Sequence, residues 1–362
     1  MLRFLQPDMH ILSIGMDRNV CVPGSAVHKR FSILGDAHPE DTFSIIVFST
    51  RAHALPDFYT IGENVRVYPT NVRSRWLYGM GALRIARRLQ DIDIVDAQDP
   101  FETGHVGRTV SLERSIPLHV QIHTDFLSPA FARHTLLNRL RVWGAGKVLR
   151  SAARVLVVSN RIKESVLAAY TLTAPITVLP LYTEIKQASP EEVNRLRERF
   201  AAFTNVLLVV ARFEPEKNIS LVLQAVSKLP SDTCLVLVGE GSERVSLEAR
   251  AAHPDLAGRV FFEGWQDPSP YYAVASLLLA PSSYEGYSLT LVEALTSGIP
   301  VLSTDVGAAR EVGALVVSEK QFSSALQEWV SNGPKRGVFT GVRYSNMEEY
   351  LSAFYKDIRA CI

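Results

Sequence analysis

Residues Leu278–Asp305 read LLAPSSYEGYSLTLVEALTSGIPVLSTD, and this stretch decides the fold. It begins with a short apolar run that ends at Ala280, which is typical of a buried strand, and a polar turn follows. The apolar periodicity of Leu289–Thr296 predicts a helix, and Pro300–Thr304 predicts a second strand. Such a strand–loop–helix–strand unit is the building block of a parallel sheet, whose ligands bind at the carboxyl ends of the strands.

Two carboxylates accompany this unit. Glu285 lies in the loop after the first strand, and Glu293 lies in the helix that follows. Both are expected to face one crevice, beside a helix N-terminus that attracts anions.

The spacing of these two residues and their surroundings resemble a known family. Seven residues separate Glu285 from Glu293, and Gly298 and Pro300 follow as a helix stop and a strand start. This pattern resembles the Glu-x7-Glu signature of glycosyltransferase family 4, the glycosyl transferases group 1. The resemblance implies a GT-B fold, in which two Rossmann-like domains face each other across a cleft.

The same resemblance implies the activity. We expect a retaining, metal-independent glycosyltransferase that moves a sugar from a UDP- or GDP-sugar to a hydroxyl of a glycan or a lipid-linked acceptor. The alternatives are a sugar-nucleotide epimerase or hydrolase on the same fold, and a non-catalytic GT-B partner subunit. We expect no obligatory cofactor beyond the nucleotide sugar, which is the donor substrate.

The length of the chain suits two domains, and its composition is typical of a soluble globular protein. The chain has 362 residues, 47% of them apolar, and a formal net charge of +1, so we expect no nucleic-acid partner. The three cysteines Cys21, Cys234 and Cys361 are widely scattered, which favours a reducing compartment and gives no metal spacing. Residues Met1–Gly15 lack the design of a secretory leader. We therefore expect a cytoplasmic location.

Strand and helix patterns alternate along the whole chain, which predicts two doubly wound α/β domains. We expect an acceptor-binding domain in residues 1–184 and a nucleotide-sugar-binding domain in residues 185–342. By resemblance, the last helix, within residues 343–362, returns to the first domain. The strands are predicted at His10–Met16, Phe43–Thr50, Asn64–Thr70, Asp93–Asp99, Leu118–Thr124, Arg154–Ser159, Ile176–Leu181, Asn205–Ala211, Thr233–Val238, Arg259–Glu263, Ser276–Ala280, Pro300–Thr304 and Ala314–Val317.

Two cations follow the first strand of the second half. Arg212 and Lys217 flank the loop after Ala211, and a guanidinium fork and a compact ammonium both suit a diphosphate. The family's Arg and Lys at this motif hold the diphosphate of the donor. The alternative is a surface location in which both pair with Glu214 and Glu216.

The resemblance also assigns the remaining donor contacts. It gives Glu293 the ribose hydroxyls, and it gives Glu285 the face of the donor sugar where positive charge develops. The family commonly has a glycine where Ser288 stands, and we interpret this serine as a good N-cap. Gly239 and Gly241 belong to a Gly-Glu-Gly loop, and a plain turn would explain both glycines equally well. The further donor-binding candidates are Gly239, Gly241, Tyr287, Ser288, Leu289, Thr290, Gly24 and Ser25.

In the first half, His123 follows a predicted strand at its carboxyl end. Family members carry a histidine here that reaches the donor sugar across the cleft, so His123 is a catalytic candidate beside Glu285. A lone histidine is more commonly structural. Acceptor contacts are expected at Asp17, Arg18 and Asp99, which also stand at strand ends.

Two other features have plainer interpretations. Asp91-Ile-Asp93 matches a metal-binding Asp-x-Asp of other glycosyltransferases, but it precedes a strand, so we interpret it as structural and predict no metal. The helix expected over residues 136–153 is basic and amphipathic. Such a helix is commonly domain surface, and weak contact with an anionic membrane face is the alternative.

Overall fold

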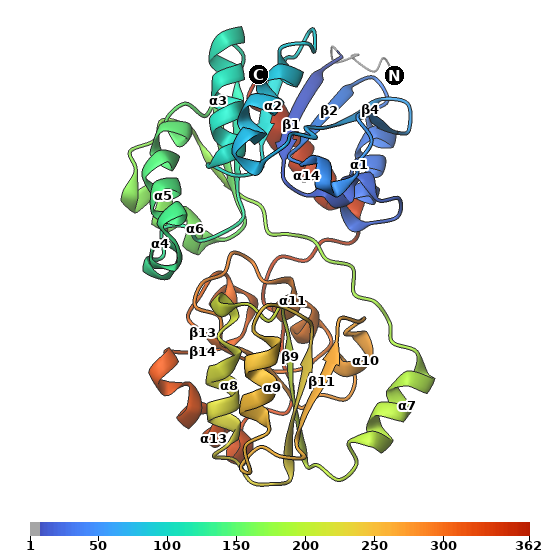
Figure 1. The fold of residues 1–362 in the computed structure, drawn as a ribbon, viewed down its shortest axis with the longest axis vertical. Coiled ribbons are helices and arrows are strands. Elements are labelled where there is room, and N and C mark those ends of the chain that lie inside the picture. Colours follow the sequence, from blue (N-terminus) through green and yellow to red (C-terminus); the bar gives the residue numbers. More distant parts are fainter. Residues whose placement is uncertain (1–7) are drawn as a thin grey trace.

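The computed structural model describes residues 8–362 and contains two sheets, each in its own α/β domain (Figure 1). Part of the N-terminal segment Met1–Gly15 therefore lies outside the described residues. Two segments without helix or strand, residues 179–189 and 333–346, run between the domains.

The N-terminal sheet has the strand order β3-β4-β2-β1-β5-β6-β7-β8, and all neighbours are parallel except β3 and β4. Its strands are β1 His10–Gly15, β2 Thr42–Val47, β3 Tyr59–Ile61, β4 Val65–Pro69, β5 Ile94–Ala97, β6 Leu118–Ile122, β7 Arg154–Val157 and β8 Ile176–Val178. Its helices are α1 Ala26–Ala37, α2 Tyr78–Ala86, α3 Glu102–Arg114, α4 Pro129–His134, α5 Leu136–Leu149 and α6 Asn160–Ala169.

The C-terminal sheet has the order β11-β10-β9-β12-β13-β14 and is parallel throughout. Its strands are β9 Asn205–Val210, β10 Thr233–Val238, β11 Val260–Gly264, β12 Leu277–Ala280, β13 Val301–Thr304 and β14 Leu315–Val317. Its helices are α7 Pro190–Arg199, α8 Ile219–Val226, α9 Arg244–Ala251, α10 Ser269–Tyr272, α11 Leu289–Thr296, α12 Ala309–Val312 and α13 Phe322–Asn332.

Both faces of each sheet are covered, because successive side chains of a strand point to opposite faces. In β1, Leu12 and Ile14 belong to one apolar core, while Ile11 belongs to the other. This explains why the strands read as continuous runs of Ile, Val and Leu.

The last helix, α14 Met347–Arg359, packs against α1 and β7 of the N-terminal domain. Tyr350, Leu351 and Ile358 are buried in the same apolar core as Ile11 of β1. In Figure 1 this red helix accordingly lies beside the blue α1. The domain limits at residues 184 and 342 stay predictions, because no helix or strand fixes either position.

Every predicted strand is present, with ends shifted by a few residues. Strand β3 was not predicted, because its sequence Tyr-Thr-Ile lacks the continuous apolar run that marks the other strands. The helix expected over residues 136–153 ends at Leu149, since the chain must turn before β7 begins at Arg154. Within residues 8–362, no helix is both long and apolar enough to cross a bilayer.

Among the parallel strands of each sheet the order reverses at one point, between β1 and β5 and between β9 and β12. Open α/β sheets bind ligands outside the carboxyl ends of the strands at such a switch point. In the C-terminal domain, the loops that follow β9 and β12 carry Arg212, Lys217 and Glu285.

Candidate active site

The loops after β9 and β12 meet through an ion pair between the Lys217 ammonium and the Glu285 carboxylate. The side chains are only 18% and 17% exposed, and the Ser282 hydroxyl also donates to Glu285 Oε1 at 2.8 Å. A positive charge and a hydroxyl therefore hold the carboxylate at the carboxyl edge of the sheet.

A cavity of about 420 Å³ opens beside this pair. Its volume falls within the range of small-molecule sites. The four principal residues predicted from sequence line it together, as do four of the other donor-binding candidates. The predicted residues in its wall are Arg212, Lys217, Gly239, Glu285, Ser288, Leu289, Thr290 and Glu293.

Arg212 is the most exposed of the four principal residues, at 62% of its side chain, and it pairs with Glu216 at 3.0 Å. The side chain of Glu216 is only 12% exposed, so the guanidinium is the part of this pair that is open to solvent. The surface pairing considered as the alternative is thus found for Arg212. Lys217 does not share it, because its partner is Glu285.

Glu293 is held by two hydroxyls. Tyr272 Oη donates to Oε2 at 2.9 Å, and Thr183 Oγ1 donates to Oε1 at 3.1 Å. Burial raises the pKa of Glu293, and these hydrogen bonds only partly oppose the shift. A carboxylate that already accepts from hydroxyls, with lone pairs remaining, is suited to bind a diol.

Glu293 also borders a second cavity of about 400 Å³, which lies between the domains and includes Gly24, Arg30 and Thr183 in its wall. Pro268, Leu289 and Glu293 belong to the walls of both cavities. The two spaces therefore adjoin, and Gly24 lies on the second rather than on the first.

The glycines after β10 are required by packing. A Cβ on Gly239, whose φ is +140°, would lie 1.9 Å from the carbonyl oxygen of Ala211, and a Cβ on Gly241 would lie 2.4 Å from that of Phe213. Both bring this loop against the loop after β9. Gly239 reaches the cavity wall and Gly241 does not, so the plain-turn interpretation accounts for Gly241.

The interpretation of Ser288 as a good N-cap was wrong. Ser288 stands at the N-cap position of α11, but its φ is +24° and its side chain caps no backbone amide. Its hydroxyl lies 3.1 Å from that of Thr290 instead. A positive φ is strained for a residue with a side chain, which explains why a glycine suits this position.

Tyr287 is 5% exposed and belongs to the apolar core. Burial raises the pKa of its phenol to about 12. Its side chain does not line the donor cavity.

His123 follows β6 and faces the loop of Glu285 across the domain interface. Its carbonyl oxygen contacts Gly286, and the next-but-one amide, Asp125 N, donates to the carbonyl oxygen of Glu285 at 3.2 Å. Burial, and after it the charge of Arg30, lowers the pKa of His123 to about 4. The ring is therefore neutral at physiological pH.

The other N-terminal candidates have local structural partners. Asp17 Oδ1 accepts from Asn19 N at 3.0 Å, and Ser25 Oγ accepts from His28 N at 3.2 Å as the N-cap of α1. Asp99 Oδ1 accepts from the amide of Phe101 at 2.7 Å, and burial raises the pKa of Asp99 to about 6. None of these residues lines the donor cavity, nor does Arg18.

Several residues that join the domains were not predicted from the sequence. The Glu311 carboxylate accepts from the backbone amides of Asn160 and Arg161 at 3.0 and 2.9 Å, at the start of α6. Arg161 also pairs with Asp305 at 2.7 Å. More than 140 residues separate these partners, so no local pattern could have indicated them.

In the part of the chain that the structure describes, the side chains with a spacing compatible with a metal ion lie away from both cavities. Among residues 8–362, the group with ligand-compatible spacing is His38, Glu40 and Asp41, and none of the three lines either cavity described above. Asp93 accepts from the amide of His10 at 2.7 Å, in agreement with a structural interpretation of Asp91-Ile-Asp93.

Comparison with known families gives one match for each half of the chain. The model described as Glycosyltransferase Family 4 matches residues 34–183. The model described as Glycosyl transferases group 1 matches residues 192–339. Together they span both sheets except β1, and they include the loops that bear the cavity.

Curated relatives agree with these matches. Alpha-monoglucosyldiacylglycerol synthase of Streptococcus pneumoniae is 26% identical over 303 residues, which are 76% of this chain and 68% of that protein. The 2-deoxystreptamine glucosyltransferase of Streptomyces kanamyceticus is 32% identical over 188 residues, 48% of this chain and 47% of the relative. The lipopolysaccharide core biosynthesis glycosyltransferase LpsE of Rhizobium meliloti is 34% identical over 113 residues, 31% of this chain and 33% of LpsE. The match thus spans less than half of the last two relatives.

Solved structures share the fold. Sucrose-phosphate synthase from Thermosynechococcus elongatus superposes with a TM-score of 0.74 at 18% identity, over 97% of both chains. Anabaena HepE in complex with UDP and glucose superposes with a TM-score of 0.67 at 18% identity, over 97% of this chain and 95% of that one.

Proposed function

Because the chain belongs to the glycosyltransferases of the group 1 and family 4 type, with the GT-B fold, we propose that it transfers a sugar from a nucleoside-diphosphate sugar to a hydroxyl acceptor, with retention of the anomeric configuration. The observation that carries the proposal is the single cavity shared by Arg212, Lys217, Glu285 and Glu293 at the switch point of the C-terminal sheet.

The diphosphate would bind Arg212 and Lys217, together with the free amides in the first turn of α11. A diphosphate competes with Glu285 for the Lys217 ammonium, so its arrival would release the carboxylate toward the donor sugar. Glu293 would accept from the two adjacent ribose hydroxyls. HepE was solved with UDP, which makes uridine donors the first to test.

In the proposed reaction the acceptor oxygen attacks the anomeric carbon from the face that the diphosphate leaves. The bond between that carbon and the phosphate oxygen breaks, and the acceptor proton passes to a phosphate oxygen. Arg212 and Lys217 would stabilise the charge that develops on the leaving diphosphate without a metal, a preorganised field of the kind that is usually the largest contribution to catalysis. Glu285 would stabilise positive charge on the sugar.

For the acceptor, an apolar surface of the N-terminal domain supports a lipid-linked molecule. A cavity of about 660 Å³ lies between α2, α3 and α5, and Trp76, Leu83 and Leu137 line it together with Arg75 and Arg141. On the neighbouring face of α5, large apolar side chains are exposed, among them Leu136, Leu140 and Trp143. Arg141 pairs with Glu102 of the same cavity at 2.9 Å. Apolar side chains beside Arg75 therefore fit a lipid with an anionic headgroup. The Streptococcus relative is named for a glucosyldiacylglycerol product.

The deciding experiment measures binding and turnover separately. UDP, GDP and ADP, each alone and as their sugars, are tested for thermal stabilisation, since a ligand of the folded form raises its apparent stability. Glu285→Gln should retain the donor and lose most of the transfer, and NMR of the product should show the anomeric configuration of the donor retained. Turnover that is unchanged in this variant would remove Glu285 from the mechanism.

Two controls separate the alternatives. Product analysis with and without an acceptor distinguishes transfer from hydrolysis or epimerisation, which need no acceptor. Chelation by EDTA should leave the rate unchanged if no metal takes part. Nucleotide binding without turnover of any sugar nucleotide would favour the non-catalytic partner subunit.

A further inference from the structure

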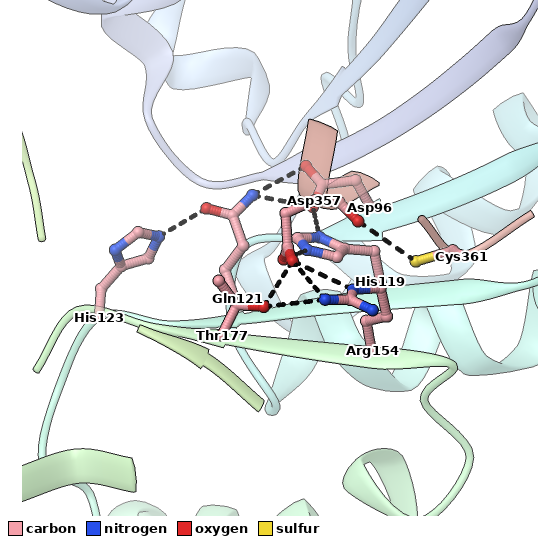
Figure 2. Close-up of polar contacts among 8 residues, drawn as sticks. All are labelled: Asp96, His119, Gln121, His123, Arg154, Thr177, Asp357 and Cys361. Atoms are coloured by element: carbon pink, nitrogen blue, oxygen red, sulfur yellow. Dashed lines mark hydrogen bonds and ion pairs between the residues drawn. The ribbon is translucent and has the colours of Figure 1, made fainter. Parts of the chain in front are cut away.

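Behind His123, a chain of buried polar side chains runs into the interior of the N-terminal domain (Figure 2). It joins Asp96 of β5, His119 and Gln121 of β6 and Asp357 of α14. The side chains of His119 and Asp96 are 0% and 2% exposed. Burial of so many polar groups is unfavourable unless each one is paired, so their pairing defines their orientations.

His119 is an imidazolium in this arrangement. Its Nδ1 lies 2.7 Å from Asp96 Oδ1, and its Nε2 lies 3.0 Å from Asp357 Oδ2. Carboxylates only accept, so both ring nitrogens must carry a proton. Burial by itself would lower the pKa of His119, but the hydrogen bonds and charges of Asp357 and Asp96 outweigh it and raise the pKa to about 9.

Asp357 has further partners that fix it to the sheet. Arg154 of β7 pairs with its Oδ1 at 2.9 Å, and the Thr177 hydroxyl donates to the same oxygen. The helix that ends the chain is thereby tied to β6, β7 and β8 through one carboxylate. We call Asp96, His119 and Asp357 the buried triad.

Gln121 connects Asp96 of the buried triad to His123 at the domain interface. Its Nε2 lies 2.8 and 2.9 Å from the two oxygens of Asp96. Since that carboxylate only accepts, the amide nitrogen must face it, and the amide oxygen must face away. Gln121 Oε1 lies 2.9 Å from His123 Nε2, so this histidine nitrogen must be the donor.

The other nitrogen of His123, Nδ1, points away from Gln121 (Figure 2). It is left without a proton, and the ring stays neutral, because burial and Arg30 lower its pKa to about 4. Asp96 opposes this shift and His119 adds to it. The backbone carbonyl of His123 adjoins Gly286, the neighbour of Glu285, which brings residue 123 to the edge of the proposed donor site.

We propose that Gln121, held by the buried triad, fixes His123 as the Nε2-protonated tautomer, so that Nδ1 accepts a hydrogen bond from a hydroxyl of the bound sugar. Gln121 is thus a positioning residue that acts through His123. The identity of the hydroxyl rests on the proposed function, whereas the tautomer does not. A hydroxyl that donates to Nδ1 is bound, but a sugar oxygen that can only accept is rejected.

The first test reads the tautomer directly and needs no substrate. The protein is labelled with ¹⁵N in its histidine rings, and the His123 signals are identified by their loss in His123→Asn. Between pH 6 and 8 we expect a protonated Nε2 and an unprotonated Nδ1. A protonated Nδ1 in the wild-type protein would overturn the proposal, and this outcome is decisive even if no variant folds.

The second test changes Gln121. Gln121→Leu removes the acceptor, so the two tautomers of His123 should mix. The matched control is Ser13→Ala, which removes another donor to Asp96, at 3.0 Å, and leaves the contact of Gln121 with His123 intact. An unchanged tautomer in Gln121→Leu, or an equal change in the control, would contradict the role of Gln121.

A third test, by enzyme kinetics, relates the tautomer of His123 to the activity. In Gln121→Leu, kcat should fall about tenfold, the loss expected for one misplaced hydrogen bond, while the dissociation constant of the nucleoside diphosphate stays unchanged. In the wild-type protein, kcat for a deoxy donor that lacks this hydroxyl should be about tenfold lower than for the intact donor. In Gln121→Leu, the two donors should have the same kcat. If the tautomer is as described but no sugar nucleotide is turned over, the proposed function fails and the positioning of His123 stands.

Discussion

Gly286 contacts the carbonyl oxygen of His123 so closely that a Cβ on the glycine would lie 1.7 Å from that oxygen. The two residues belong to different domains, and Gly286 is the neighbour of Glu285. The absence of a side chain at residue 286 is therefore what allows the donor loop to meet the carboxyl end of β6.

Gly286→Ala should prevent this contact. A Cβ needs more than an ångström of additional space against backbone atoms that have little freedom to move, so the domains must separate. We expect kcat for the transferred sugar to fall at least about tenfold, with little change in nucleoside-diphosphate affinity, because the donor cavity lies in one domain. Steady-state kinetics and calorimetry measure the two quantities. Wild-type kcat in this variant would show that the contact is dispensable.

Arg212 and Lys217 should contribute separately to diphosphate binding. Arg212→Ala and Lys217→Met should each raise the dissociation constant of UDP or GDP by about tenfold or more, as expected for the loss of a charge-assisted hydrogen bond. Arg197→Ala is the matched control, since Arg197 is exposed on α7 and does not line the cavity. Isothermal calorimetry gives the affinities. Equal affinity in all three variants would refute the assignment.

Ser288→Gly should stabilise the protein. Glycine relieves the strain of a φ of +24° but loses more conformational entropy on folding, so we expect a net gain of about 0.5–1 kcal/mol in the free energy of unfolding. Ser288→Ala separates the causes, because alanine keeps the strain and lacks the hydroxyl near Thr290. Urea unfolding of both variants checks this. A gain in the alanine variant equal to that of glycine would exclude backbone strain as the cause.

Glu293 should make nucleoside binding pH-dependent. Burial raises its pKa, and only the ionised carboxylate accepts from both ribose hydroxyls. Donor affinity should therefore fall on acidification at a pH above the usual range of a glutamate. Tyr272→Phe removes a donor to Glu293 at 2.9 Å, so it should move this midpoint further upward. Calorimetry across pH tests both statements, and a pH dependence that survives in Glu293→Gln would assign it to another group.

The sequence predicted those features that depend on local patterns. Apolar runs indicated the strands. The position of Arg212, Lys217 and Glu285 in loops after strands, with Glu293 in the helix that follows, indicated a shared cavity. The conformation of Ser288 could not be read in this way, because a positive φ depends on how the whole loop closes. Gln121 reads as an ordinary buried strand residue until its contacts with Asp96 and His123 are seen. The pairing of His119 with Asp357 joins residues 238 positions apart, and only the return of α14 brings them together.

The buried triad should also make stability depend on pH. The folded pKa of His119 is about 9, above its ordinary value of 6.5, so protonation of this residue favours the folded state. Its contribution is complete below about pH 6.5 and is lost as the pH rises through about 9. His119→Gln breaks the buried pairs and should destabilise the protein by about 3–5 kcal/mol at neutral pH.

The difference in the free energy of unfolding between wild type and His119→Gln isolates the contribution of His119. Other histidines, such as His10 and His38, whose pKa values are lowered, titrate alike in both proteins. The difference in the free energy of unfolding should shrink between pH 7 and pH 10. Asp357→Asn should reduce the same pH dependence, because it removes one of the two carboxylates that hold the imidazolium. Urea unfolding at several pH values measures these differences, and a gap that stays constant across this range would show that His119 is neutral in the folded protein.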